Sequence, residues 1–171
     1  MKIRKVEAEH HARVYALLKS AFPGSNYEAN LVRLFHTRQT PVHEWACIQS
    51  GKVIAYLAFS NAYRGKEVCG LHLAPIAVAP EWQLQGIGSQ LLRFALRQEE
   101  IKQETLFVLG EPAYYRQFGF TSTDSPTCPY DPDNRHFLSL RNDSHDSFTV
   151  GYAPEFQSAG KPRASRGKRR R

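Results

Sequence analysis

One segment, residues 73–93, constrains the fold of this chain more than any other part of it. Its sequence is LAPIAVAPEWQLQGIGSQLLR. Strand-forming residues end near Val78, a turn containing Gly86 and Gly88 follows, and a helix with a broad apolar face continues to about Gln98. A strand that turns directly into such a helix favours a sheet that is covered by helices.

The glycine turn is predicted to bind an anion. Glycine adopts positive φ readily and has no Cβ to keep a ligand away from the backbone. The first N–H groups of the following helix have no partner within the helix, and the helix dipole adds partial positive charge. A phosphate is suited to such a place. Gly86 and Gly88 are equally consistent with close packing of the helix on the sheet, and the glycines alone do not decide between the two interpretations.

The spacing of the turn excludes the commoner nucleotide motifs. The chain has no G-x-x-x-x-G-K-[ST], and no G-x-G-x-x-G followed by an acid about 20 residues later. It has Q-x-x-G-x-G at Gln83, Gly86 and Gly88. This motif resembles the acyl-CoA pyrophosphate loop of the GNAT acetyltransferase superfamily, [QR]-x-x-G-x-[GA]. The later segment GEPAYYRQFGF, residues 110–120, is similar to the bacterial YhbS-like branch, in which G-[DE]-P precedes a tyrosine and then G-F.

The remaining pattern predicts an α/β fold, a mixed α+β sheet with helices, in one domain. Strands are expected at 2–6, 44–49, 52–60, 69–79, 105–109, 136–141 and 148–152, and helices at 8–22, 25–38, 86–98 and 112–118. This order matches the GNAT acyl-CoA N-acyltransferase fold that the resemblance implies for residues 1–156. Residues 157–171 are expected to form a basic, disordered tail. Pro75 predicts an irregular or open strand because proline cannot donate a ladder hydrogen bond.

The resemblance implies acetyl-CoA as co-substrate and assigns its contacts. Backbone N–H groups of residues 84–89 would hold the pyrophosphate. The backbone of residues 76–78 would pair with the pantetheine amides and polarise the thioester carbonyl. In the family a splay beside the fourth strand admits the pantetheine arm, which explains why Pro75 is tolerated there. The expected cofactor-binding residues are Ile76, Ala77, Val78, Gln83, Leu84, Gln85, Gly86, Ile87, Gly88 and Ser89.

Tyr115 is the expected general acid. It stands four residues before Gly119, where the family places the tyrosine that protonates the departing thiolate. A phenol, with an ordinary pKa of about 10, keeps its proton at neutral pH and can give it to a developing thiolate. An ordinary core aromatic is the alternative interpretation of Tyr115, and its neighbour Tyr114 is expected to pack.

The general base is less clearly marked. Many members of the family carry a glutamate on the fourth strand, whereas this chain has His72-Leu73-Ala74-Pro75 there. His72 is the catalytic candidate, because an ordinary histidine pKa of about 6.5 lets it take a proton directly or through water. Glu28 and Glu111 are further candidates, although acids at helix starts are commonly caps. An amine that arrives deprotonated would need no base.

Two functions follow from the resemblance. The first is transfer of an acetyl group from acetyl-CoA to an amine by direct attack, which the lack of cysteine in either motif favours over a covalent enzyme intermediate. The second is a catalytically inactive acyl-CoA-binding module, motivated by the missing strand carboxylate. The acceptor is expected to contact residues 22–28 and 122–135. Asp124, Asp131 and Asp133 form a mildly acidic rim there that could favour a cationic amine.

The net charge of +7, from 23 Lys and Arg against 16 Asp and Glu, is concentrated at one end of the chain. Residues 161–171, KPRASRGKRRR, carry seven of the basic residues and no acid, so the rest of the chain is formally neutral. This tail is expected either to make weak contact with nucleic acid, such as RNA or ribosomes, or with an acidic partner, or to be a solvated terminus.

The cysteine positions and the hydropathy of the chain exclude further classes of protein. Cys47, Cys69 and Cys128 lie far apart with no C-x-x-C pair, which argues against a disulfide framework or a zinc site and favours a reducing cytoplasm. No metal is therefore expected. No apolar stretch approaches the roughly 20 residues that span a bilayer, and the first residues lack the apolar core of a signal peptide.

Overall fold

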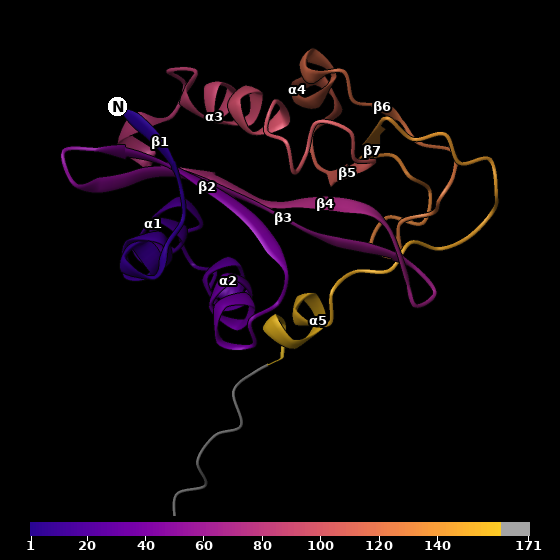
Figure 1. Ribbon diagram of the computed structural model, residues 1–171, viewed down its shortest axis with the longest axis horizontal. Coiled ribbons are helices and arrows are strands. Elements are labelled where there is room, and N and C mark those ends of the chain that lie inside the picture. The colour runs from indigo at the N-terminus through magenta and orange to yellow at the C-terminus, as the bar shows by residue number, and fades with distance from the viewer. Residues whose placement is uncertain (162–171) are drawn as a thin grey trace, which may run out of the picture.

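A single seven-stranded sheet forms the centre of the protein. The computed structural model describes residues 1–161, so most of the basic tail lies outside the described residues (Figure 1). The spatial order of the strands is β1 (Lys2–Lys5), β2 (Val42–Gln49), β3 (Lys52–Arg64), β4 (Glu67–Val78), β5 (Leu106–Leu109), β7 (Phe137–Leu140) and β6 (Thr121–Ser122). β4 and β5 are parallel and the other neighbouring pairs are antiparallel, which confirms the predicted mixed sheet.

Helices cover both faces of the sheet (Figure 1). On one face lie α1 (His11–Ala21), α2 (Tyr27–Thr37) and α5 (Glu155–Ala159), and on the other lie α3 (Ile87–Leu96) and α4 (Pro112–Tyr115). Three short 3-10 turns, η1 (Ala8–His10), η2 (Pro80–Trp82) and η3 (Arg116–Phe118), complete the helical elements. Alternation along β3 supplies both cores, because Leu57 and Phe59 pack with α3 whereas Tyr56 and Ala58 pack with α1 and α2.

β4 and β5 part soon after they meet. Their parallel pairing is confined to Leu71–Leu106, His72–Phe107 and Leu73–Val108, while β4 continues to Val78. The register between β4 and β3 also shifts here, around Pro75. The expected irregular strand is therefore confirmed: from residue 74 onward, one edge of β4 has no strand partner among the residues that the structure describes.

The C-terminal part of the sheet differs from the sequence prediction. Residues 148–152 are not a strand and make only isolated bridges, Tyr63 with Gly151 and Thr149 with Thr127. The two segments approach closely at Gly151, where a Cβ would lie 3.2 Å from the Cβ of Tyr63. The pattern also missed the two-residue strand β6 and the helix α5. The predicted domain boundary between residues 156 and 157 lies inside α5.

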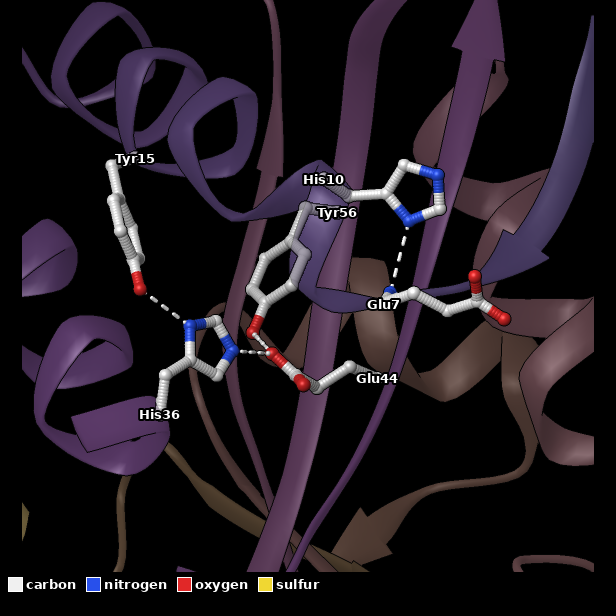
Figure 2. A network of polar contacts seen from close by, with 6 residues as sticks. All are labelled: Glu7, His10, Tyr15, His36, Glu44 and Tyr56. Carbon is white, nitrogen blue, oxygen red and sulfur yellow. Dashed lines mark hydrogen bonds and ion pairs between the residues drawn. The ribbon is translucent and has the colours of Figure 1, made fainter. Parts of the chain in front are cut away.

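A buried polar network ties the two N-terminal helices to the sheet (Figure 2). Glu44 on β2 accepts hydrogen bonds from the hydroxyl of Tyr56 and from Nε2 of His36, each at 2.6 Å. Nδ1 of His36 lies 2.6 Å from the hydroxyl of Tyr15 on α1. The ring of His11 stacks on His36 with centroids 3.6 Å apart. Hydrogen bonds thus link Tyr15 on α1 through His36 on α2 to Glu44 on the sheet, and the network orients α1 and α2 on the sheet.

Candidate active site

The glycine turn before α3 borders a hollow of about 500 Å³. Gly86 is the N-cap of α3 with φ of +79°, and nothing lies within 4 Å of where its Cβ would be. Gln83 holds the turn to the end of β4 by donating to the carbonyl of Val78 over 3.0 Å. The first helical hydrogen bond of α3 runs from the N–H of Gln90 to the carbonyl of Gly86. The N–H groups of residues 87–89 precede that bond and have no acceptor within the helix.

Gly88 has a different role from Gly86. A Cβ on Gly88 would lie 3.2 Å from Cγ2 of Val78 and 3.4 Å from the hydroxyl oxygen of Tyr114. Close packing of α3 on β4 therefore explains Gly88, whereas backbone conformation explains Gly86. The close-packing interpretation is therefore confirmed for Gly88, and anion binding at the turn stays a prediction.

The predicted cofactor-binding residues are brought together by β4 and the turn. Val78, Gln83, Leu84, Gly86, Ile87, Gly88 and Ser89 line the same hollow, and the amide nitrogen of the Gln85 side chain donates to the backbone carbonyl of Glu81 beside it. Residues 76–78 pair with β3 along one edge, and their other edge faces the gap toward β5. Ala77 turns its side chain into the core beneath α1 and α2. Only its backbone is available to a ligand in the gap.

The two adjacent tyrosines of α4 point to different places. Tyr114 lines the hollow of the glycine turn, and its hydroxyl lies 3.3 Å from the hydroxyl of Ser89. Tyr114 therefore places a polar group at the hollow, whereas the sequence predicts only a packing role for it. Tyr115 is 7% exposed, and its Cε2 would lie 2.5 Å from a Cβ on Gly110. Burial, with a smaller effect of Tyr114, raises the pKa of Tyr115 to about 12, so its hydroxyl is protonated at neutral pH.

His72 lines a second, smaller cavity of about 230 Å³ between the end of β5 and α5. Its Nε2 donates to the carbonyl of Gly151 over 3.0 Å, and its ring stacks on Tyr152 with centroids 3.6 Å apart. Burial lowers the pKa of His72 to about 4, partly opposed by the Gly151 hydrogen bond, so the ring is neutral. Because a carbonyl can only accept, Nδ1 carries the lone pair.

The walls of this second cavity, which we call the aromatic pocket, are mainly apolar and carry no charged residue. It is lined by Tyr27, His72, Leu73, Ala74, Phe107, Leu109, Tyr130, Tyr152 and Phe156. Tyr27 and Tyr130 come from the two segments in which acceptor contacts are expected. Sequence reasoning missed the aromatic residues themselves, because they are scattered over four separate segments.

The other candidate acids do not reach the aromatic pocket. Glu28 accepts a hydrogen bond from the hydroxyl of Ser25 over 2.8 Å, although Asn26, not Ser25, is the N-cap of α2, and Glu111 is exposed at the start of α4. In the expected acidic rim, Asp131 accepts from the backbone of His136, and Asp133 lies 3.9 Å from Arg135. These two aspartates are engaged within their own loop.

The two hollows lie on the same strand. Residues 72–74 of β4 border the aromatic pocket and Val78 borders the glycine turn, so about 13 Å of strand separates them. The open edge of β4 joins them. The arrangement suits an extended ligand with an anion at the glycine turn and a reacting group at the aromatic pocket.

Residues 1–161 contain no group of three or more His, Cys, Asp or Glu that could hold a metal ion. None of the helices in this part of the chain combines the length and the hydropathy needed to cross a membrane.

Known proteins share both the sequence pattern and the arrangement. Residues 41–122 match the model of the acetyltransferase (GNAT) domain. Two proteins of Escherichia coli strain K12 that carry the name uncharacterized N-acetyltransferase are similar in sequence. YjhQ is 36% identical over 74 residues, and YhbS is 34% identical over 108 residues, or 61% of this chain. The chain spans 41% and 64% of the lengths of these two relatives.

Solved structures extend the similarity to nearly the whole chain. The structure of YhbS from Escherichia coli in complex with CoA has a TM-score of 0.82 at 26% identity and covers 91% of each chain. A GNAT family acetyltransferase from Brucella melitensis in complex with acetyl-CoA has a TM-score of 0.75, also at 26% identity, covering 91% of this chain and 97% of its own.

Proposed function

We propose that this chain, whose residues 41–122 match the GNAT acetyltransferase domain, is an acetyl-CoA-dependent N-acetyltransferase, an acyltransferase that acetylates an amine by direct attack. The observation that carries the proposal is the course of β4. Its open edge connects the glycine turn, where the first N–H groups of α3 have no acceptor within the helix, to a pocket with room for an acceptor. The CoA and acetyl-CoA in the two solved relatives support acetyl-CoA as the co-substrate.

Acetyl-CoA would lie along β4 in this proposal. The pyrophosphate would accept hydrogen bonds from the N–H groups of residues 84–89, with the hydroxyl of Ser89 beside them. The pantetheine arm would follow the open edge at residues 76–78, pairing with the backbone as a strand would. The thioester would then reach the parting of β4 and β5, where Ala74 and Leu109 border the aromatic pocket.

The chemistry needs one acid and, at most, a weak base. The amine nitrogen attacks the thioester carbonyl carbon, a C–N bond forms, and the C–S bond breaks as the tetrahedral intermediate collapses. We assign the proton taken up by the CoA thiolate to the Tyr115 hydroxyl. The proton released by the nitrogen would go to Nδ1 of His72 or to water. Backbone N–H groups at the open edge of β4 would stabilise the oxyanion.

Acetyl-CoA binding and acetyl transfer, measured separately, test this function. We expect calorimetric titration to show acetyl-CoA binding to the wild type and much weaker binding to Gly88→Val, whose side chain would displace Val78 or Tyr114. Thiol release should accompany acetylation of an amine. Binding without transfer to any member of a broad amine panel would instead favour the inactive acyl-CoA-binding module, and no binding would overturn both.

We further propose that residues 161–171 make weak contact with nucleic acid or another acidic partner, and that the protein works in the cytoplasm. Clustered Lys and Arg support the first point, and the free thiols of all three cysteines support the second. Comparing the full chain with a form that lacks residues 161–171 for binding to poly(U) RNA at low and high salt tests the contact. Equal retention of both forms at low salt would contradict it.

A further inference from the structure

The aromatic pocket has no charged residue in its lining. Five aromatic side chains and the neutral ring of His72 surround it, with Leu73, Ala74 and Leu109 at the side where β4 and β5 part. The rings of Tyr130 and Phe156 each stand edge-on to Tyr152, with centroids 4.9 Å apart. Such a wall offers ring faces and ring edges to a ligand, and little else.

The phenol groups of the wall are engaged away from the ligand. The hydroxyl of Tyr27 donates to the backbone carbonyl of Phe156 over 2.7 Å, and that of Tyr152 lies 3.5 Å from Sγ of Cys128. Burial raises the pKa of both phenols above the ordinary value, that of Tyr27 to about 12. Neither Tyr27 nor Tyr152 is therefore available as a phenolate at neutral pH. Tyr130, which is 55% exposed, forms the rim of the pocket.

The size of the pocket suits one planar ring. A cavity of about 150 Å³ with apolar walls is known to hold benzene. The present cavity, at about 230 Å³, has room for a six-membered ring and a short substituent. The ring would lie among Phe107, Tyr152 and Phe156, and an atom attached to it would point toward Ala74 and Leu109, where the thioester is proposed to end.

From this pocket we infer that the acceptor is an arylamine, an uncharged amine whose nitrogen is bonded directly to an aromatic ring. The inference rests on the proposed acetyltransferase function and adds the substrate class. An alkylammonium ion entering the pocket would lose its hydration without meeting a carboxylate. Attraction of such a cation to the ring faces recovers only part of that loss.

An arylamine also fits the lack of a strong base at the site. It is uncharged at neutral pH, so its nitrogen lone pair is free to attack the thioester carbon. The nitrogen becomes positive only as the C–N bond forms, and its proton is then acidic enough to pass to Nδ1 of His72 or to water. The C–S electron pair leaves with sulfur, which takes the proton of Tyr115. No dedicated carboxylate is needed.

A matched pair of amines tests the inference. Aniline and cyclohexylamine have the same ring size and the same point of attachment, and they differ in aromaticity and in charge at pH 7. With saturating acetyl-CoA, we expect kcat/KM to be at least about tenfold higher for aniline than for cyclohexylamine. Binding is measured separately with 4-fluoroaniline, whose ¹⁹F resonance should shift and broaden when the protein is added.

Variants locate the binding. Tyr130→Ala changes a rim residue that is largely exposed, so it should fold normally and raise KM for aniline about threefold to tenfold. Tyr152→Leu, which removes the ring stacked on His72, should raise the KM for aniline further and weaken the ¹⁹F shift of 4-fluoroaniline. Phe148→Leu is the control, because Phe148 packs beside Arg64 outside the pocket, and it should leave both measurements unchanged.

The outcomes separate the two proposals. Acetylation of cyclohexylamine as fast as aniline, or a ¹⁹F response that Tyr130→Ala and Tyr152→Leu do not alter, overturns the arylamine inference and leaves the acetyltransferase proposal standing. Absence of acetyl-CoA binding overturns the acetyltransferase function. Since 4-fluoroaniline binding does not require turnover, its response still reports directly on the pocket in that case.

Discussion

The hydroxyl of Tyr114 lies 3.3 Å from the hydroxyl of Ser89, joining the short helix α4 to the first turn of α3. The next residue, Tyr115, turns its ring the other way, against Gly110 and Phe120. In the proposed complex, Tyr114 therefore lies beside the pyrophosphate of acetyl-CoA, and Tyr115 donates its proton at the thiol end. Each role predicts a different kinetic change when the hydroxyl is removed.

Tyr115→Phe should lower kcat by about 100-fold or more and leave acetyl-CoA binding within twofold of the wild type, because only proton donation to the thiolate is lost. Tyr114→Phe should raise the KM for acetyl-CoA by about twofold to tenfold with little change in kcat, because it removes a hydrogen-bonding group beside the pyrophosphate. Steady-state kinetics with acetyl-CoA varied at a fixed amine concentration measures both. The same change in the two variants would contradict the separate roles.

Gly86→Ala should weaken acetyl-CoA binding by about tenfold or more. Its positive φ disfavours any side chain, so the first amides of α3 would move from the positions that hold the pyrophosphate. Gly51→Ala is a matched control: its φ is +75°, nothing lies within 4 Å of its missing Cβ, and it sits in the β2–β3 hairpin. Both variants should lose about 1–2 kcal/mol of unfolding free energy. Calorimetry should show weaker acetyl-CoA binding for Gly86→Ala alone.

Local signals explain why the strand, the glycine turn and the helix on the proposed cofactor side lie where the sequence predicts them. The end of β4, the glycine turn and the start of α3 are contiguous, so their geometry depends on short-range preferences. The parting of β4 from β5 was likewise expected from the missing donor of Pro75.

The acceptor side depends on long-range packing. Only the fold brings together the aromatic residues of the pocket, among them Tyr27, Phe107, Tyr130 and Phe156. In the sequence, each of them is indistinguishable from an ordinary core aromatic. For the same reason, residues 148–152 were wrongly predicted as a strand: their apolar side chains serve the packing around His72 and Arg64 rather than a ladder.

Glu44→Gln should lower the free energy of unfolding by about 1–3 kcal/mol, because Tyr56 and His36 both lose a charged acceptor in a buried place. For a chain of this length that corresponds to a fall in Tm of about 2–10 °C. Glu99→Gln is the control, since its pair with Lys102 is exposed and contributes little. Thermal melting at pH 7 measures both. A loss of kcat/KM in Glu44→Gln under conditions where it is fully folded would mean that the network does more than hold the helices.

The stability of the protein should fall as pH is lowered from about 6.5 to 4, and His72 should account for one proton of that change. Burial lowers the pKa of His72 to about 4 in the folded state, while the unfolded chain has the ordinary value of 6.5. Between these values the unfolded state binds the extra proton, so acid favours unfolding, and above 6.5 the residue has no effect on the pH dependence. The full difference is about 3 kcal/mol. His72→Gln keeps a donor for Gly151 and cannot titrate, so its unfolding free energy, measured by urea titration at several pH values, should fall less steeply in this window. Parallel curves for the two proteins would show that His72 titrates alike in both states.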